Sequence, residues 1–279
     1  MDLTRVADAH YLRSQATTRA VVAAVLALWQ AAGPSGFRDH LVRAAGLVAA
    51  GQLTQAVQAA AYLTVVADAQ ALARPQAVVA PRAFAGRSAD ERPLVDVLSF
   101  ASRRAWTMLD AGADYATANT SGMATVTRIV ANEVTQAGVS AVSAGVVGYP
   151  DIGGYVRRLS PPSCGRCAIL GGKWFQWNAG FARHPGCDCV HVPAAERGDV
   201  RDPKSYFDSL SVKDQDHYFG RAEAEAIRGG ADVTRTVNAT TKRQKRATSV
   251  PRSLDRLITG RSRGEAIDTL TRYGYLQAD

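Results

Sequence analysis

All cysteines of this 279-residue chain lie within one short segment, and their spacing is that of metal ligands. Cys164 and Cys167 are separated by a glycine and an arginine. Sixteen residues later the sequence His184-Pro-Gly-Cys-Asp-Cys adds Cys187 and Cys189. Two ligands that are two residues apart can reach one zinc ion from a tight turn, whose backbone N–H groups can hydrogen-bond the thiolates. The segment therefore predicts a small zinc site built from cysteines and a histidine.

These side chains offer five candidate ligands for the four positions of a tetrahedral site. If Cys187 and Cys189 lie on a strand, both point to the same face, and one member of the second group stays outside the metal shell. Spacing alone does not choose that member. Two disulfides, or buried reduced thiols, are the alternatives, and a cytoplasmic setting favours metal over disulfides. Because a closed set of protein ligands leaves no position for water, the zinc is expected to be structural rather than catalytic.

The composition is that of a globular protein with a basic balance. Hydrophobic residues make up 47% of the chain and charged residues 21%, so one large or two modest domains are expected. The net charge of +8 favours contact with a polyanion such as nucleic acid, or only aids solubility. The longest apolar run, residues 20–29, is too short for a bilayer, which needs about 20 residues. With no signal peptide at its start, the chain is expected to be cytoplasmic and not to contact a membrane.

Helical spacing of apolar residues dominates the first half of the chain. It predicts helices over residues 3–32, 37–50, 54–72, 94–109 and 115–146. Residues 33–36 and Gly51 are expected to end helices, and Gly122 and Gly138 to interrupt the last one.

The second half changes character near residue 148. It predicts three short strands, over residues 155–159, 173–177 and 189–192, and then helices over 203–229 and 264–273. The central strand is suited to form a hairpin that joins the two ligand pairs. We therefore expect a mostly α chain with an α+β second domain: a helical N-terminal part, a small β-rich zinc unit and C-terminal helices. The expected divisions are a helical N-terminal region at 1–92, a second domain at 93–240 that holds the zinc motif 164–189, and a basic tail at 241–279 with a short terminal helix.

That tail contains the strongest basic run of the chain. Its members are Lys242, Arg243, Lys245, Arg246, Arg252, Arg256, Arg261 and Arg263. Asp255 is the one acid within this run. Such a run can neutralise phosphates without reading base sequence, so DNA or an acidic partner is one interpretation and a solvated tail is the other.

The cysteine segment also carries a family resemblance. Residues 163–170, followed by 177–189, resemble the head-morphogenesis (MuF-like) minor capsid proteins of tailed bacteriophages that infect actinobacteria. The ending His-Pro-x-Cys-x-Cys is the most recognisable part of that family's motif. The resemblance extends over about residues 90–279, which makes 93–240 the expected head-morphogenesis domain.

The resemblance implies a role in the virion. Such proteins are minor head components near the portal vertex, which aid head assembly and DNA packaging or ejection. Phage portal and capsid proteins are the implied partners, and packaged double-stranded DNA is a further candidate. The chain would be made in the host cytoplasm and enter the capsid interior.

A capsid maturation protease is the alternative, because some relatives are described so. A protease needs a nucleophile, a base and an orienting group. The sequence has no Gly-x-Ser-x-Gly elbow, and its cysteines are assigned to zinc, so no catalytic residue is identified. A nucleic-acid-binding zinc ribbon is a third interpretation, in which Trp174, Phe175 and Trp177 would stack on bases rather than cover the metal unit.

Overall fold

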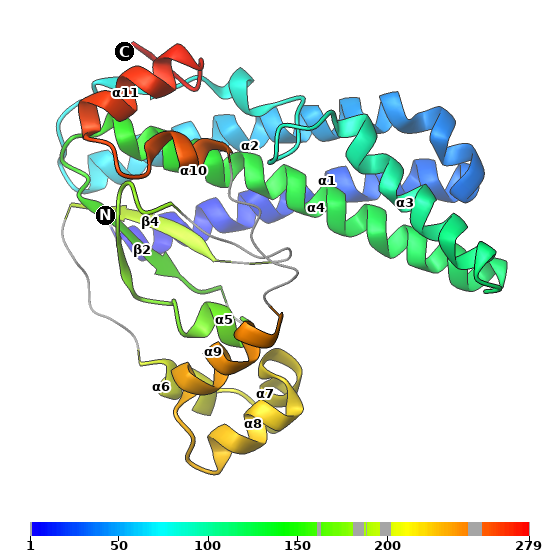
Figure 1. Ribbon diagram of the computed structural model, residues 1–279. Coiled ribbons are helices and arrows are strands. Elements are labelled where there is room, and N and C mark those ends of the chain that lie inside the picture. Colours follow the sequence, from blue (N-terminus) through cyan, green and yellow to red (C-terminus); the bar gives the residue numbers. More distant parts are fainter. Residues whose placement is uncertain are drawn as a thin grey trace.

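Long helices make up the first half of the molecule and lie side by side (Figure 1). The computed structural model describes residues 2–160, 163–180, 187, 189–195, 202–244 and 253–278. Together α1 (Leu3–Gly36), α2 (Leu41–Ala69), α3 (Leu94–Asp110) and α4 (Tyr115–Gly148) form what we call the bundle. A short 3-10 helix, η1 (Phe37–His40), joins the first two.

Local side-chain chemistry explains where these helices begin and bend. Asp2 accepts a hydrogen bond from the backbone N–H of Thr4, and Asp114 accepts one from Thr117, which satisfies free donors at the starts of α1 and α4. Gly33 has φ 65° and ψ −178°, values outside the helical region. The predicted break near the end of the first helix therefore exists as a bend at this glycine.

The other predicted glycine breaks are wrong. Gly51, Gly122 and Gly138 lie inside continuous helices, so the helices predicted over 37–50 and 54–72 largely merge into α2. A β-carbon at Gly51 would lie 2.6 Å from Val21, and one at Gly122 would lie 2.4 Å from the ring of Trp29. These positions are glycine because neighbouring helices approach closely there, an influence that local sequence does not reveal.

The bundle core runs without interruption from the N-terminal helices to α4. Trp29 is fully buried among side chains of the other bundle helices, and its indole N–H donates to Asn119 of α4 at 2.8 Å. Leu98 of α3 and Val126 of α4 belong to the same cluster. The division expected near residue 92 therefore does not coincide with a break in packing.

The C-terminal segment folds back onto the bundle. The strand β5 (Leu276–Ala278) pairs antiparallel with β1 (Ala77–Val79), which precedes the 3-10 helix η2 (Pro81–Phe84). Two short helices, α10 (Ser253–Ile258) and α11 (Arg263–Arg272), come before β5. Buried residues of this segment that join the core of α2 and α4 are Leu254, Ile258, Ala266, Leu270 and Leu276. Residues 253–278 are thus part of the packed fold rather than a free tail.

A second sheet lies below the bundle in the view of Figure 1. It contains β2 (Gly154–Arg158), β3 (Trp174–Gln176) and β4 (Val190–Ala194) in the order β3-β2-β4, and all pairs are antiparallel. The three predicted strands are therefore present. The expected hairpin is not formed as predicted, because β2 lies between β3 and β4. The described residues from 154 to 195 are called the cysteine unit below.

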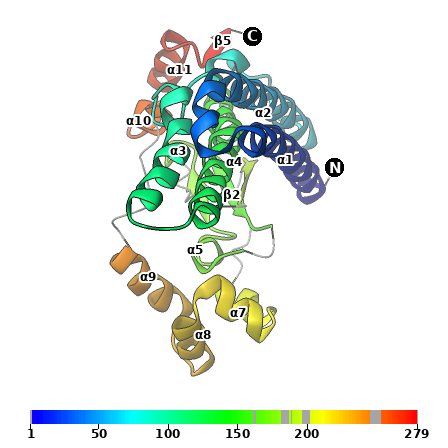
Figure 2. The same ribbon diagram turned by 90° about the vertical axis from the view of Figure 1, so that its right-hand side faces the viewer.

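Four short helices form a lobe that projects away from the bundle (Figures 1 and 2). They are α6 (Pro203–Asp208), α7 (Val212–Phe219), α8 (Arg221–Arg228) and α9 (Val233–Gln244). The rings of Phe207 and Phe219 meet edge to face at 5.0 Å in the centre of this lobe, in one cluster with buried cysteines. The expectation of a mostly helical chain with a small β part is confirmed.

The helical stretch Leu3–Ala69 is long and apolar enough to cross a membrane by length and composition alone. Its most apolar 18-residue window has a mean hydropathy of 1.5, and 22% of that window is buried. This is weak evidence for a membrane segment, because the core helices of soluble proteins pass the same test.

A glycine substitution tests the close-packing explanation. Gly122→Ala should cost about 1–3 kcal/mol, because the added methyl overlaps the ring of buried Trp29. Gly46→Ala is the matched control, since a β-carbon there meets nothing within 4 Å, and it should stabilise the helix by about 0.5–1 kcal/mol. Urea unfolding of both variants gives the two changes, and equal effects would contradict the explanation.

The buried side chain of His10 predicts how the stability of the fold depends on pH. It stacks on Tyr62 at 4.2 Å, and burial, aided by the charge of Arg13, lowers its pKa from 6.5 to about 4. The unfolded chain therefore binds this proton before the folded chain does, so stability is complete above pH 6.5 and falls as the pH drops toward 4. At about 1.4 kcal/mol per pH unit, His10 should account for about 3 kcal/mol of that loss.

Urea unfolding between pH 7 and pH 4 measures this loss. His10→Phe, which keeps an aromatic ring beside Tyr62, should flatten the dependence, whereas exposed His217→Gln should not. Parallel profiles for the wild type and His10→Phe would show that His10 is not responsible.

Candidate metal centre

The first cysteine pair lies on a tight turn that opens a single helical turn, α5 (Gly165–Ala168). The Sγ atom of Cys164 accepts the backbone N–H of Cys167 at 3.5 Å, which is the predicted turn-to-sulfur hydrogen bond. The preceding residue, Ser163, donates its N–H to the hydroxyl of Tyr206 at 2.6 Å, and that hydroxyl donates to the Ser163 carbonyl at 3.0 Å. Tyr206 of the lobe thereby holds the turn in place.

The second pair of cysteines meets the first. The sulfurs of Cys167, Cys187 and Cys189 are all buried and lie within 4.8 Å of one another. Cys167 and Cys187 have their Sγ atoms 3.3 Å apart, well beyond the S–S bond length of about 2.05 Å, and none of the four described cysteines forms a disulfide. Cys164 completes the cluster through its contact with Cys167. The predicted convergence of the cysteines is confirmed.

This cluster fits a four-coordinate metal ion. Tetrahedral zinc with Zn–S bonds of about 2.3 Å places its sulfurs about 3.8 Å apart, a value between the 3.3 Å of the Cys167–Cys187 pair and the 4.8 Å limit within which the three buried sulfurs lie. Thiolates are ligands that zinc and other thiophilic metals prefer. The fifth candidate, His184, lies outside the described residues. The geometry supports a cysteine-based metal site, and the identity of the metal belongs to the proposal below.

Crowding and burial raise the pKa values of the clustered thiols. Hydrogen bonds with Cys164, Cys187 and Cys189, together with burial, raise the pKa of Cys167. For Cys189 the hydrogen bond with Cys167 lowers the pKa, but Cys187 and burial outweigh it and raise the pKa to about 12. The buried guanidinium of Arg157 favours the Cys189 thiolate. Crowded thiols therefore stay protonated unless a metal ion compensates their charge.

His191 lies next to the cluster, on β4, and is packed on all sides. Its ring meets the edge of Tyr155 at 4.6 Å, and its carbonyl accepts the hydroxyl of Tyr62 at 2.8 Å. Its Nε2 atom lies 3.5 Å from the Oγ atom of Ser143. Because Ser143 and His191 are both buried, this serine–histidine pair is not accessible to a polypeptide substrate.

The aromatic residues of the cysteine unit pack inward. Phe175 stacks on Tyr155 at 5.3 Å, and the guanidinium of Arg157 lies 5.6 Å from its ring centre. Trp177 packs against the bundle core beneath the guanidinium of Arg263, at 4.6 Å. Phe175 therefore packs on the cluster that holds the cysteines, as one interpretation expects, whereas Trp177 packs on the bundle core.

The basic run does not form one surface. Arg263 points inward and donates to the last carbonyls of α4, those of Val146 at 3.0 Å, Val147 at 3.3 Å and Tyr149, and to Ile152 at 2.7 Å. It caps the helix and is not part of an exposed basic patch. Of the other basic residues, Arg256 and Arg261 are exposed, and Lys242 and Arg243 lie on α9. The remaining three, Lys245, Arg246 and Arg252, lie outside the described residues.

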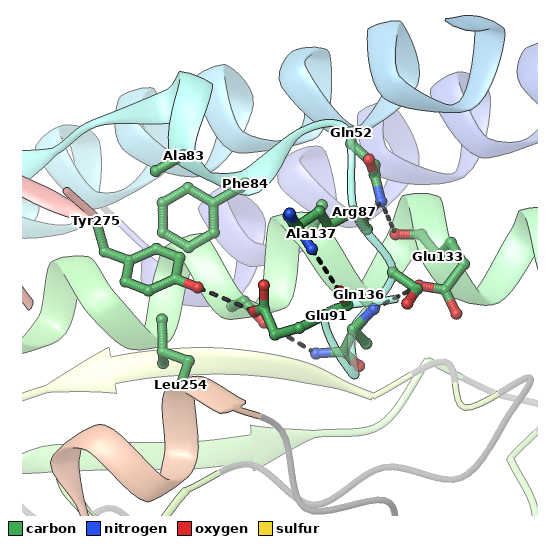
Figure 3. A pocket seen from close by; sticks show the side chains of 13 residues that line it. Gln52, Ala83, Phe84, Arg87, Glu91, Glu133, Gln136, Ala137, Leu254 and Tyr275 are labelled. Carbon is green, nitrogen blue, oxygen red and sulfur yellow. Dashed lines mark hydrogen bonds between the residues drawn. The ribbon is translucent and has the colours of Figure 1, made fainter. Parts of the chain in front are cut away.

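A polar pocket of about 60 Å³ lies between the bundle and the 85–93 loop (Figure 3). Gln52 donates to the Arg87 carbonyl at 2.7 Å, and Glu133 accepts the N–H of Ala89 at 2.7 Å. The hydroxyl of Tyr275 donates to the Glu91 carboxylate at 3.1 Å. Sequence reasoning missed this pocket, although polar residues on buried helix faces were the available signal. Its groups fasten the loop and the C-terminal segment to the bundle.

Serine substitution tests the metal site. Cys164→Ser combined with Cys167→Ser should abolish metal binding and unfold the cysteine unit and lobe, because the binding energy of a structural metal is folding energy, on the order of 10 kcal/mol in small zinc domains. Elemental analysis and thermal unfolding of the purified chain measure both effects. Ser163→Ala, which keeps every thiol, is the control and should retain its metal. Normal stability of the double variant would exclude a structural metal.

The cysteine cluster is thus observed in the fold, whereas the expected role in a phage head rests on the sequence motif alone. Comparisons of the chain with protein-family models, with curated proteins and with solved structures found no match. The resemblance to head-morphogenesis proteins stays a prediction that rests on the cysteine segment.

Proposed function

We propose that this chain is a minor capsid protein of a tailed bacteriophage, of the head-morphogenesis type, with a structural zinc ion. It would lie near the portal and aid head assembly and DNA packaging or ejection. The observation that carries the proposal is the cluster of four cysteines, three of them buried, formed by the same motif that resembles this family.

The position of the cluster suits a structural role. Cys164 and Cys167 lie on the turn held by the lobe, whereas Cys189 directly precedes β4, which packs against the bundle. Zinc held by four thiolates would supply positive charge and a rigid cross-link at this junction, with no open position for a substrate. The geometry supports an assembly protein better than an enzyme.

Two exposed surfaces support contacts with capsid partners and DNA. Single apolar side chains on α1 and α2 are exposed, Leu12 to 63% and Val42 to 79%, and each could contribute to a contact with portal or capsid proteins. The net charge of +8 and the exposed Arg256 and Arg261 suit contact with phosphates of packaged DNA. The chain would thus bridge protein and nucleic acid inside the head.

A capsid maturation protease is the second candidate, and one contact bears on it. Ser143 and His191 approach each other, but both are buried and 3.5 Å is long for a working nucleophile–base hydrogen bond. We therefore consider the protease function less well supported than the function of a minor capsid protein.

Mass spectrometry of purified mature particles tests the proposal, using a phage whose genome encodes this chain. We expect the intact chain in the particle, at low copy relative to the major capsid protein. Absence of the chain, combined with a shortened capsid protein, would support the protease instead. A phage carrying Ser143→Ala separates the two, because only a protease that uses this serine would leave the capsid protein unprocessed.

A further inference from the structure

A second cavity lies where the cysteine unit meets the bundle. It has a volume of about 30 Å³. Its walls come from α1, α2, α4 and the strand that follows the second cysteine pair, and they include His10, Gln55, Thr135, Cys189 and His191. The cavity is thus enclosed between elements far apart in sequence.

Two polar atoms of its walls have no protein partner among the described residues. These are Nδ1 of His10 and Oε1 of Gln55. His10 is 6% exposed and Gln55 is fully buried. The amide of Gln55 is held in place, because its Nε2 atom donates to the Ser14 carbonyl at 2.9 Å and to Thr18 at 3.1 Å. Its oxygen therefore cannot turn away to find another donor.

The size of the cavity selects its ligand. A water molecule needs about 10–15 Å³ of space for its centre and two to four polar partners, so this cavity accepts one or two waters and no larger ligand. We propose that it is a built site for an internal water molecule, bound by Gln55 Oε1 and His10 Nδ1, which links α1 to α2 beside the cysteine unit. This inference depends neither on the identity of the metal nor on the proposed function.

Both proposed partners of the water molecule are hydrogen-bond acceptors, so the water would donate to each of them. The amide oxygen of Gln55 accepts only, and His10 is neutral at physiological pH because burial lowers its pKa to about 4. One water can donate an O–H group to each, which assigns the His10 proton to Nε2. The water would exchange slowly, since the side chains of both its partners are buried.

Magnetic relaxation dispersion of the solvent tests the proposal on the full chain, because it counts internal waters that exchange slowly. The double variant His10→Phe/Gln55→Met should contain one such water fewer than the wild type. Gln58→Met is the matched control: Gln58 lies one turn along α2, its Oε1 is also buried without a described partner, and it does not line the cavity. This control should keep the wild-type count. An unchanged count in a folded double variant would overturn the proposal.

A crystal structure of the wild type gives an independent readout if the double variant does not fold. Water density is expected within about 3.2 Å of both Gln55 Oε1 and His10 Nδ1. The nitrogen chemical shifts of His10 should also show Nδ1 unprotonated. A dry cavity, or a protonated Nδ1, would contradict the assignment.

Discussion

Thiols that are buried together cannot all ionise unless a cation lies among them. Cys167, Cys187 and Cys189 are in this situation, with their sulfurs within 4.8 Å of one another. The packing around the cluster reflects that constraint, because Phe207 and Phe219 of the lobe share one small core with the cysteines. A metal ion at the cluster would cross-link this small core, which is the usual way in which a unit with few buried residues becomes stable.

Polar contacts then attach the cysteine unit to the bundle. The guanidinium of Arg158 on β2 forms a two-pronged hydrogen bond with Asp8 of α1, at 2.9 and 2.8 Å. Tyr62 reaches from α2 to the carbonyl of His191, and Arg263 caps the end of α4, where the chain enters the sheet. These contacts are directional, so they determine how the unit lies on the helices in a way that apolar packing alone would not.

The bundle supplies a rigid support for this attachment. Its two long central helices approach closely because glycines face large side chains, as Gly122 faces Trp29. Gly51 of α2 likewise faces Val21 of α1. The spacing of the bundle helices therefore depends on small residues at their contacts.

Much of this protein could be predicted from its sequence, and what could be predicted was local. Apolar periodicity located the long helices, apart from the wrong break at Gly51, and the three strands of the cysteine unit, and the cysteine spacing predicted the cluster, because turn geometry and ligand reach depend on neighbouring residues. Periodicity did not predict α9, α10, β1 or β5, and it did not divide residues 203–229 into three short helices. Tertiary structure decided the rest. Gly51 continues a helix because Val21 lies opposite, and Arg263 caps α4 because the chain returns to it. His10 and Gln55 enclose a cavity only after three helices and a strand meet. Such roles depend on which distant groups meet in the folded chain, and the type and spacing of neighbouring residues do not determine those meetings.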